Sequence, residues 1–321
     1  MLRIAHLSDL HVLDWSGARP LEFVNKRWTG VLNLVGARRG KHPVAVAERL
    51  AEHLAAQIAA DRVDHVIVSG DLTNLALDSE FRRARQVLDR IGGADRLTVI
   101  PGNHDVYTES AVQSRSFETH MGDLCAPDAA GVSQLRQQGR AAYPIVRAPA
   151  AHVRIYGLHS AVPTPPFCAW GQVGAEQLVR LQTLVAQEPA QVRVRIVVLH
   201  HNLHRRGHVA EATARLLDRA AVAQALRDID AQLVLHGHSH PAHQGHLAAA
   251  PGRAAIPVIG CGSSTWQHGG RNGGSFNVIE VGSDGLAAIR AFRAPADSDV
   301  FATDGRDLLG DALRPDRAIA L

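Results

Sequence analysis

Residues 2–11 read LRIAHLSDLH, an apolar run that ends in two potential metal ligands, Asp9 and His11. A short continuous run of this kind is typical of a strand that is covered on both faces. Side chains that directly follow such a strand lie at the carboxyl edge of an open α/β sheet, where ligands bind. The segment therefore predicts a buried N-terminal strand that delivers Asp9 and His11 to a site.

Four further segments repeat this arrangement of a strand followed by potential ligands. They supply Asp71 in SGDLTN, Asn103 and His104 in PGNHD, His200 in VLHHN, and His238 with His240 in LHGHSH. This pool of carboxylate, carboxamide and imidazole groups, without a thiolate, suits Mn, Fe, Co or Zn rather than a calcium cage or a sulfur site. Because each segment directly follows the end of a strand, we expect the side chains to meet at one edge of the sheets.

The rest of the chain alternates short apolar runs with helical patterns, which indicates a layered α/β domain. The expected strands are 2–7, 65–68, 97–100, 153–158, 192–199, 233–235 and 256–259, and the expected helices are 44–60, 80–91, 175–186 and 212–226. The run SFNVIEVGSDGLAAIRAF is typical of a β-hairpin. We predict one domain over residues 1–293, followed by a polar tail over 294–321 that lies on the surface or is loosely ordered.

Composition narrows the classes of function. With 46% hydrophobic and 20% charged residues, the 321-residue chain can bury a sizeable core. The aromatic share of 4% argues against a stacking surface for nucleic acid, while the net charge of +3 is compatible with a phosphate-bearing substrate. The three cysteines, without a CxxC pair, predict neither a disulfide framework nor a sulfur-ligated zinc site. The chain opens on a strand-like run and has no apolar stretch of membrane-spanning length, so we expect a cytoplasmic protein.

The motifs DxH, GD, GNHD, H and GHxH occur in this order over residues 1–264 and together resemble the calcineurin-like metallophosphoesterase family. The resemblance implies a four-layer α/β/β/α sandwich with two facing mixed sheets. It also implies a dinuclear metal centre in which Asp9, His11 and His240 hold one ion, Asn103, His200 and His238 hold the other, and Asp71 bridges the two. The opening HLSDLH and the closing GHSH are further similar to the subgroup that contains bacterial class III cyclic-nucleotide phosphodiesterases.

The same resemblance implies a metal-dependent phosphoric ester hydrolase. A hydroxide that bridges two Mn, Fe, Zn or Co ions would attack phosphorus in line with the leaving group. His104 is expected to stabilise the phosphoryl oxygens or to protonate the leaving group, and Asp105 to orient its imidazole. His201 and Asn74 are expected on the substrate side, and Asn74 could also cap the next helix.

The remaining histidines are numerous, because the chain has nineteen. In the pair His200-His201 the first is expected to bind metal, although Asn202 stands where many family members have proline. We expect solvated or hydrogen-bonded core positions, without a catalytic role, for His204, His208, His236, His243 and His246.

An insert over about residues 20–42 follows the first ligand motif and has a different character. Within it, residues 23–41 read FVNKRWTGVLNLVGARRGK, with no acidic residue between Lys26 and Lys41. An apolar stripe at helical spacing consists of Val24, Trp28, Val31, Leu32 and Val35. The segment is either an amphipathic helix packed on the domain or a cap that contacts a membrane surface or an acylated substrate.

Three functional hypotheses follow. The leading one is a dinuclear-metal phosphodiesterase. The first alternative is a pyrophosphatase that acts on a lipid-linked nucleotide, such as a UDP-diacylglucosamine-like molecule, with peripheral contact to the inner membrane through residues 23–41. The second alternative is a non-catalytic scaffold of the same fold, which is disfavoured because such scaffolds usually lose ligands or the catalytic histidine, whereas this chain keeps all seven ligands and His104.

Overall fold

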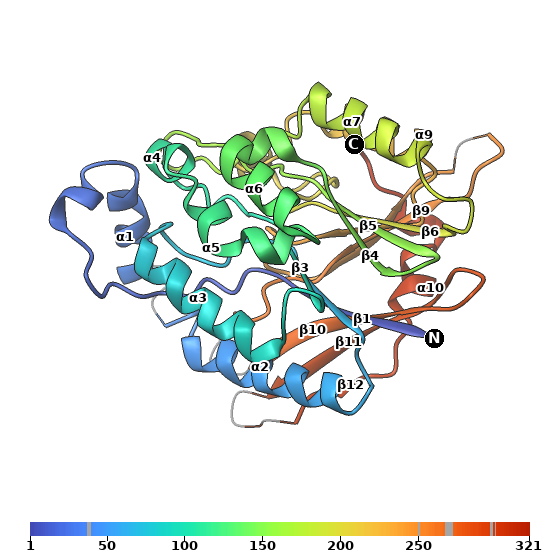
Figure 1. Ribbon diagram of the computed structural model, residues 1–321, viewed down its shortest axis with the longest axis horizontal. Helices are drawn as coiled ribbons and strands as arrows, with labels where there is room; N and C mark the ends of the chain where they lie inside the picture. The colour runs from blue at the N-terminus through green and yellow to red at the C-terminus, as the bar shows by residue number, and fades with distance from the viewer. Residues whose placement is uncertain (37–39, 250, 267–271, 296–297, 299) are drawn as a thin grey trace.

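A computed structural model describes residues 1–36, 40–249, 251–266, 272–295, 298 and 300–321. Its strands form two mixed six-stranded sheets, and Figure 1 shows the sheets between two groups of helices. The layered α/β sandwich expected from the sequence is therefore confirmed.

The first sheet has the strand order β12-β11-β10-β1-β2-β3. Its strands are β1 (Leu2–Leu7), β2 (His65–Val68), β3 (Leu97–Val99), β10 (Asn272–Val281), β11 (Leu286–Pro295) and β12 (Ala302–Thr303). Strands β1, β2 and β3 are parallel, so their carboxyl ends lie at one edge. Strands β10 and β11 form the expected antiparallel hairpin, and β10 joins the sheet beside β1.

The second sheet has the strand order β4-β5-β6-β7-β9-β8. Its strands are β4 (Ile145–Ala150), β5 (Val153–Gly157), β6 (Val194–Val198), β7 (Leu233–His236), β8 (His243–Leu247) and β9 (Ile256–Gly260). The four central strands are parallel, and the edge strands β4 and β8 are antiparallel to their neighbours. Neither edge strand is predicted from the sequence, because partly exposed edges lack a continuous apolar run.

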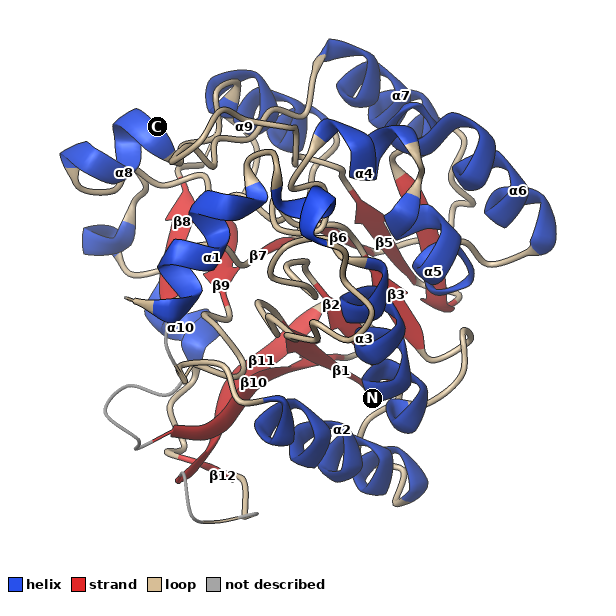
Figure 2. Ribbon diagram, turned by 90° about the vertical axis from the view of Figure 1, so that its left-hand side faces the viewer, coloured by secondary structure: helices blue, strands red, loops and turns tan. Residues whose placement is uncertain are grey.

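Helices surround the two sheets. They are α1 (Arg27–Val35), α2 (Val44–Ala59), α3 (Asp78–Ile91), α4 (Glu109–Gln113), α5 (Ser116–Cys125), α6 (Ala129–Gln138), α7 (Ala175–Ala186), α8 (His208–Thr213), α9 (Arg219–Asp228) and α10 (Leu308–Ala312), with short 3-10 turns η1 (Pro20–Phe23), η2 (Gly139–Ala142) and η3 (Pro315–Arg317). Helix α2 contacts β10, whereas α7 and α9 pack together over the second sheet. Figure 2 shows α2 and α7 on opposite sides of the strands.

One helix prediction is wrong, because residues 212–226 do not form a single helix. Helix α8 ends at Thr213 and α9 begins at Arg219. Between them the carbonyl of Ala214 accepts a hydrogen bond from the Nε2 atom of His238, at 2.9 Å. The carboxylate of Asp218 accepts the backbone N–H of Gly174 at 2.7 Å. These long-range contacts hold the chain in a loop that local helical spacing does not reveal.

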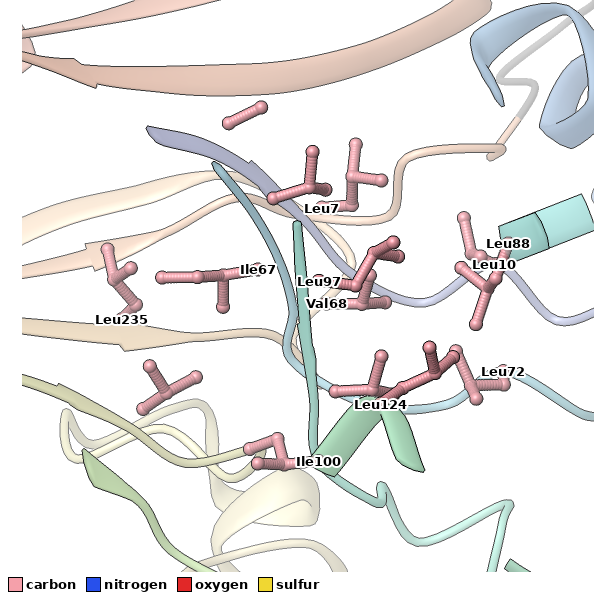
Figure 3. Packing of buried hydrophobic residues seen from close by; sticks show 14 of the residues in the cluster. Leu7, Leu10, Ile67, Val68, Leu72, Leu88, Leu97, Ile100, Leu124 and Leu235 are labelled. Carbon is pink, nitrogen blue, oxygen red and sulfur yellow. The ribbon is translucent and has the colours of Figure 1, made fainter. Parts of the chain in front are cut away.

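The hydrophobic core joins the sheets face to face. Along β6, Ile196 and Val198 belong to the cluster shared with the first sheet, whereas Val197 faces the cluster beneath α7 and α9. Figure 3 shows Leu235 of the second sheet beside Ile67 of the first. Each fully buried Leu or Ile contributes about 1.5–3 kcal/mol. The two sheet edges that carry the loops are thus held in fixed relation.

The last residues are more than the surface tail expected from the sequence. Phe301, Leu308 and Ala312 are buried in the core shared with the first sheet. Ala318 forms a bridge with His246 of β8. No helix among the described residues is long and apolar enough to cross a membrane.

Candidate metal centre

The structure brings the seven expected ligands together at the carboxyl ends of the parallel strands. Asp9 and His11 follow β1, Asp71 follows β2, Asn103 follows β3, His200 follows β6, and His238 and His240 follow β7. The loops touch closely. A Cβ atom at Gly102 would collide with the Asp71 carboxylate, and one at Gly237 would collide with Ser8 and Asp9. Glycine is needed at these two positions because side chains from neighbouring loops fill the space.

The first group of ligands contains two imidazoles and one carboxylate. The Nε2 atoms of His11 and His240 lie 3.3 Å apart. The Oδ1 atom of Asp9 lies 3.8 Å from the His11 nitrogen and 3.7 Å from the His240 nitrogen. That oxygen is buried and has no hydrogen-bond partner among the described residues. An unpartnered buried carboxylate oxygen between two imidazole nitrogens fits a bound cation.

The second group of ligands gathers around the side-chain oxygen of Asn103. The Oδ1 atom of Asn103 lies 2.9 Å from Nδ1 of His238 and 3.2 Å from Nε2 of His200. The other ring nitrogens face backbone carbonyls, Nδ1 of His200 that of Ser69 at 2.8 Å and Nε2 of His238 that of Ala214. When these nitrogens donate their protons to the backbone carbonyls, the neutral rings have a lone pair on the nitrogens beside Asn103 that can bind an ion. Metal-binding histidines have this arrangement.

Asp71 lies between the two groups. Its Oδ2 atom is 3.7 Å from Nε2 of His11 and 3.4 Å from Nε2 of His200, while Oδ1 accepts the backbone N–H of His104 at 2.8 Å. Although burial alone would raise it, the charges of His200 and His104 hold the pKa of Asp71 well below its usual range. An ionised carboxylate that reaches both groups fits the bridging role implied by the family resemblance.

The electrostatics of the site also fit cations. Burial raises the pKa of Asp9 to about 6, against the opposing effect of His200. Although burial disfavours its charged form, the Asp71 carboxylate raises the pKa of His200 to about 9. The buried carboxylates of Asp9 and Asp71 are therefore stabilised by positive charge on neighbouring groups. Divalent ions supply such charge without a proton, which leaves the histidines neutral and able to coordinate.

The backbone is unusual where the ligands lie. Positive φ angles of 54°, 47°, 54°, 63° and 55° occur at Asp9, His11, Asp71, His238 and His240. Non-glycine residues rarely adopt this region, and each costs about 1–3 kcal/mol. Contacts between the loops hold these conformations, such as the hydrogen bond of 3.0 Å from the N–H of His238 to the Asp9 carboxylate.

His104 and Asn74 form a pair beside the ligands. Nδ1 of His104 lies 2.6 Å from the backbone oxygen of Asn74 and therefore donates to it. The ring of His104 stacks on Tyr107, with centroids 5.2 Å apart. The side chain of Asn74 is buried and donates to the carbonyl of His11. Asn74 thus supports His104 and His11 from behind the site.

Asp105 and His201 also lie behind the ligands. The Asp105 carboxylate accepts hydrogen bonds from the backbone of Leu72, Thr73 and Gly102, and so joins the loops after β2 and β3. The backbone oxygen of Asn74, rather than this carboxylate, receives the His104 proton. His201 is buried, with Nδ1 2.9 Å from Oγ of Ser160 and its ring 4.5 Å from that of His238.

Two adjoining cavities open at the site. The metal cavity, of about 340 Å³, is lined by ligands such as Asp71 and His238 and by Arg206. The side cavity, of about 510 Å³, is lined by Lys26, Thr29, Leu32 and Asn33 of the insert and by Tyr107 and Phe167. Asn103, His104 and Ala169 line both. A substrate at the metal ligands therefore has room to extend along the insert.

Three residues near the site are absent from the sequence prediction. The ring of His42 lies 4.5 Å from that of His11, and Nδ1 of His42 lies 2.8 Å from Oγ1 of Thr265. Arg206 brings a positive charge to the metal cavity, and Lys26, which lines the side cavity, donates to Thr164. His42 and Lys26 are in the insert, whose position the sequence does not fix. Arg206 could have been suspected from its place shortly after His200.

The insert packs partly on the domain, as one of the two expected arrangements requires, and leaves several apolar side chains exposed. Val31 packs partly against the core, whereas Val24 and Leu32 are 79% and 61% exposed. Arg27 donates to the backbone of Leu75 at 2.7 Å and thereby anchors α1 beside the loop after β2. Residues 37–39, which include two of the predicted basic residues, lie outside the described residues.

A family model and two solved structures place this arrangement among known proteins. The model of the calcineurin-like phosphoesterase family matches residues 2–242. A dimetal phosphatase from Danio rerio is similar with a TM-score of 0.55 and 14% identity, over 94% of this chain and 98% of that one. A purple acid phosphatase from yellow lupin (Lupinus luteus) seeds is similar with a TM-score of 0.53 and 10% identity, over 100% of this chain and 56% of that one. No curated protein matches the sequence.

The fold and the ligand set define a metal-dependent hydrolase of phosphoric esters. The chain belongs to the calcineurin-like phosphoesterase family. The family implies two divalent metal ions, and the clustered histidine and aspartate side chains fit them.

Proposed function

We propose that the chain is a phosphodiesterase, in which one ester group of the substrate occupies the side cavity while phosphorus lies at the metal ligands. The observation that carries this proposal is the side cavity of about 510 Å³, which shares Asn103 and His104 with the metal cavity. A phosphomonoester has a single organic group, whereas a diester has a second one that needs space beyond the metals. The similarity to the two phosphatases leaves the substrate class open.

Two bound divalent ions supply polarisation of the phosphoryl oxygens and a lowered pKa for the attacking water. The protein groups around them bind and orient the ester. The guanidinium of Arg206 in the metal cavity offsets the negative charge of the phosphate. Burial lowers the pKa of Lys26 to about 8, so near neutral pH its ammonium also favours an anion in the side cavity.

His104 is the residue we assign to proton transfer. Its Nδ1 proton is held by the backbone oxygen of Asn74, and the ring lines both cavities. When the ring is protonated, Nε2 carries the second proton and can give it to the leaving alkoxide. Stacking on Tyr107 fixes the ring plane, so that this proton stays directed towards the site.

An activity panel with metal-reconstituted enzyme tests the proposal. Under Mn, Fe, Co or Zn we expect bis(p-nitrophenyl) phosphate to have a higher kcat/KM than p-nitrophenyl phosphate, by about tenfold for 1.4 kcal/mol of extra binding in the side cavity. Cyclic AMP in the same panel tests the finer hypothesis of a class III cyclic-nucleotide phosphodiesterase. A clear preference for the monoester would contradict the diesterase proposal.

A second candidate, a pyrophosphatase for a lipid-linked nucleotide in peripheral contact with the inner membrane, rests on the exposed apolar residues beside the side cavity. Trp28 and Phe167 form an edge-to-face pair with centroids 6.2 Å apart, and Leu32 and Phe167 both line the cavity while 61% and 75% exposed. In Figure 1, α1 lies at the left-hand end of the molecule, towards which β1 runs. This position suits an acyl chain or a membrane surface that is close to the active site.

Vesicle binding and a UDP-linked acylated sugar test the second candidate together. We expect wild-type protein to sediment with anionic vesicles and to cleave the acylated sugar, and Leu32→Glu to lose both properties. Val179→Glu is the matched control, because Val179 is also 61% exposed but lies on α7. Absence of binding and of cleavage in the wild type would remove this candidate.

A further inference from the structure

A second group of histidines lies outside the seven ligands of the metal centre. His204 is in the loop after β6, His236 is the last residue of β7, and His243 is the first residue of β8. One ring nitrogen from each of the three lies within 4.8 Å of the other two. None of the three is assigned to the dinuclear centre, so their proximity has no explanation in the phosphoesterase reaction.

His236 has the orientation of a metal ligand. Its Nδ1 atom lies 3.1 Å from the backbone oxygen of Gly237 and therefore donates to it, which leaves a lone pair on Nε2. The side chain is fully buried, and Nε2 has no hydrogen-bond partner in the described part of the chain. A backbone carbonyl holds the far nitrogen of most metal-bound histidines in the same way. The ring fits only because residue 260 is glycine, since a Cβ atom there would collide with it.

The other two histidines add further unpartnered nitrogens. Nδ1 of His204 and Nδ1 of His243 are also buried without a hydrogen-bond partner within the described ranges. Buried polar atoms are nearly always satisfied, so an unpartnered nitrogen on each of the three rings is compatible with a bound metal ion. Burial lowers the pKa of His204 to about 3 and that of His243 to about 4. Both rings are therefore neutral near pH 7, which is the form that binds metals.

We propose that His204, His236 and His243 form a third metal site, which binds one Zn²⁺ ion with water or a small anion in the fourth position. Three neutral imidazoles without a carboxylate suit zinc better than manganese or magnesium. Tetrahedral zinc with Zn–N bonds of about 2.0–2.1 Å places its ligand nitrogens roughly 3.3 Å apart. The observed limit of 4.8 Å leaves only a small movement to that arrangement.

The stacked rings show which residue has to move. The rings of His204 and His243 lie face to face, with centroids 3.5 Å apart and an angle of 13° between their planes. Because the lone pairs lie in the ring planes, stacked rings direct them in two parallel planes, and one ring has to tilt before both nitrogens reach the same ion. His243 has room to tilt, because it is partly exposed and lies on the edge strand β8.

Neighbouring charges set the expected strength of the site. Arg206 and Arg219 act on His204, and Arg317 acts on His243. These cations oppose a divalent ion, so this site should bind zinc more weakly than the dinuclear centre with its two carboxylates. An ion here would join the loop after β6, which carries His200 and Arg206, to β7 and β8.

Zinc stoichiometry of the full-length protein tests the proposal. After equilibrium dialysis against micromolar Zn²⁺, mass spectrometry of the metal should find three ions per chain in the wild type. His204→Asn and His243→Asn should each hold one ion fewer and keep phosphoesterase activity. His208→Asn, which changes an exposed histidine nearby, is the control and should match the wild type.

Two outcomes would overturn the third site. Equal zinc content in the wild type and in a folded variant would show that the triad binds no zinc. A variant that loses its activity and also loses two or more ions would show that the histidines support the dinuclear centre instead. Thermal melts establish which variants fold, and the two substitutions lie on different elements, so either variant alone decides the question.

Discussion

The ligand loops line the metal cavity and the insert lines the adjoining side cavity, and the two regions are built in different ways. The ligand loops are short, buried and hydrogen-bonded to one another, as between His238 and Asp9. The insert is longer and leaves apolar side chains such as Val24 and Leu32 exposed. It is held at separate points, including the hydrogen bonds from Arg27 to the backbone of Leu75 and Ala76. We therefore expect chemistry to depend on the sheet edges and substrate choice to depend on the insert.

Removal of the shared carboxylate should have the largest effect. Asp71→Ala should lose both metals and reduce kcat/KM. Loss of a group that only supports a metal ligand costs roughly 10–100-fold, so loss of the bridging ligand itself should cost more. Asp89→Ala is the control, because this aspartate is 52% exposed on α3. Metal analysis and kinetics on both proteins check the prediction, and a variant that keeps two ions and full activity would contradict the bridging role.

Substitution of His104 should separate catalysis from metal binding. His104→Asn should keep both metals and lower kcat by about 10²–10⁴-fold, because a general acid contributes that much. The deficit should be smaller for p-nitrophenol esters than for alkyl esters, since a good leaving group needs less protonation. A uniform deficit over all leaving groups would instead assign His104 to the phosphoryl oxygens.

Changes in the insert should alter substrate preference and leave the metals in place. Leu32→Glu should reduce kcat/KM for an apolar diester by roughly tenfold, in line with the modest contribution of single apolar pocket contacts. The rate with a small monoester and the metal content should stay close to wild type. If both substrates lose equally, then α1 supports the metal centre rather than the substrate.

A last expected effect, on stability rather than on activity, lies where the two regions meet. The buried carboxyl group of Glu80 accepts the N–H of Leu75 at 2.8 Å, in the loop that Arg27 also holds. Burial raises the pKa of Glu80 to about 8 from its ordinary value of 4.5. The unfolded chain therefore loses this proton first, and stability should fall as the pH rises between those values, at most by about 1.4 kcal/mol per unit of pKa difference.

Glu80→Gln removes this titration and keeps an acceptor oxygen. The melting temperature of the variant relative to wild type should therefore be higher at pH 8 than at pH 5. A difference that is the same at both pH values would show that Glu80 has an ordinary pKa in the folded protein.

The comparison also explains what the sequence could and could not predict. Strands such as β1 and β2 are continuous apolar runs that local pattern identifies, and the ligands follow directly from their ends. The positive φ of Asp9 and His240 arises from contacts between distant loops, which no local pattern encodes. The break between α8 and α9 has the same origin, because the His238 ring forms a hydrogen bond with the backbone carbonyl of Ala214. His42 was missed because its position depends on how the insert folds back towards His11.

The histidines outside the motifs show a second limit of local pattern. His236 and His238 are two residues apart, yet the first belongs to the triad with His204 and the second contacts Asn103. Spacing alone does not separate such neighbours. Their roles depend on the direction of each ring and on the partner of each nitrogen.

Electron paramagnetic resonance of the manganese-loaded protein tests the central claim most directly. If Asp71 bridges two ions between the two ligand groups, the wild type should bind two Mn²⁺ per chain at this centre and show the spectrum of an exchange-coupled pair. Asp71→Ala should lose that spectrum. A wild-type spectrum of isolated Mn²⁺ ions alone, at one or two ions per chain, would contradict the dinuclear centre.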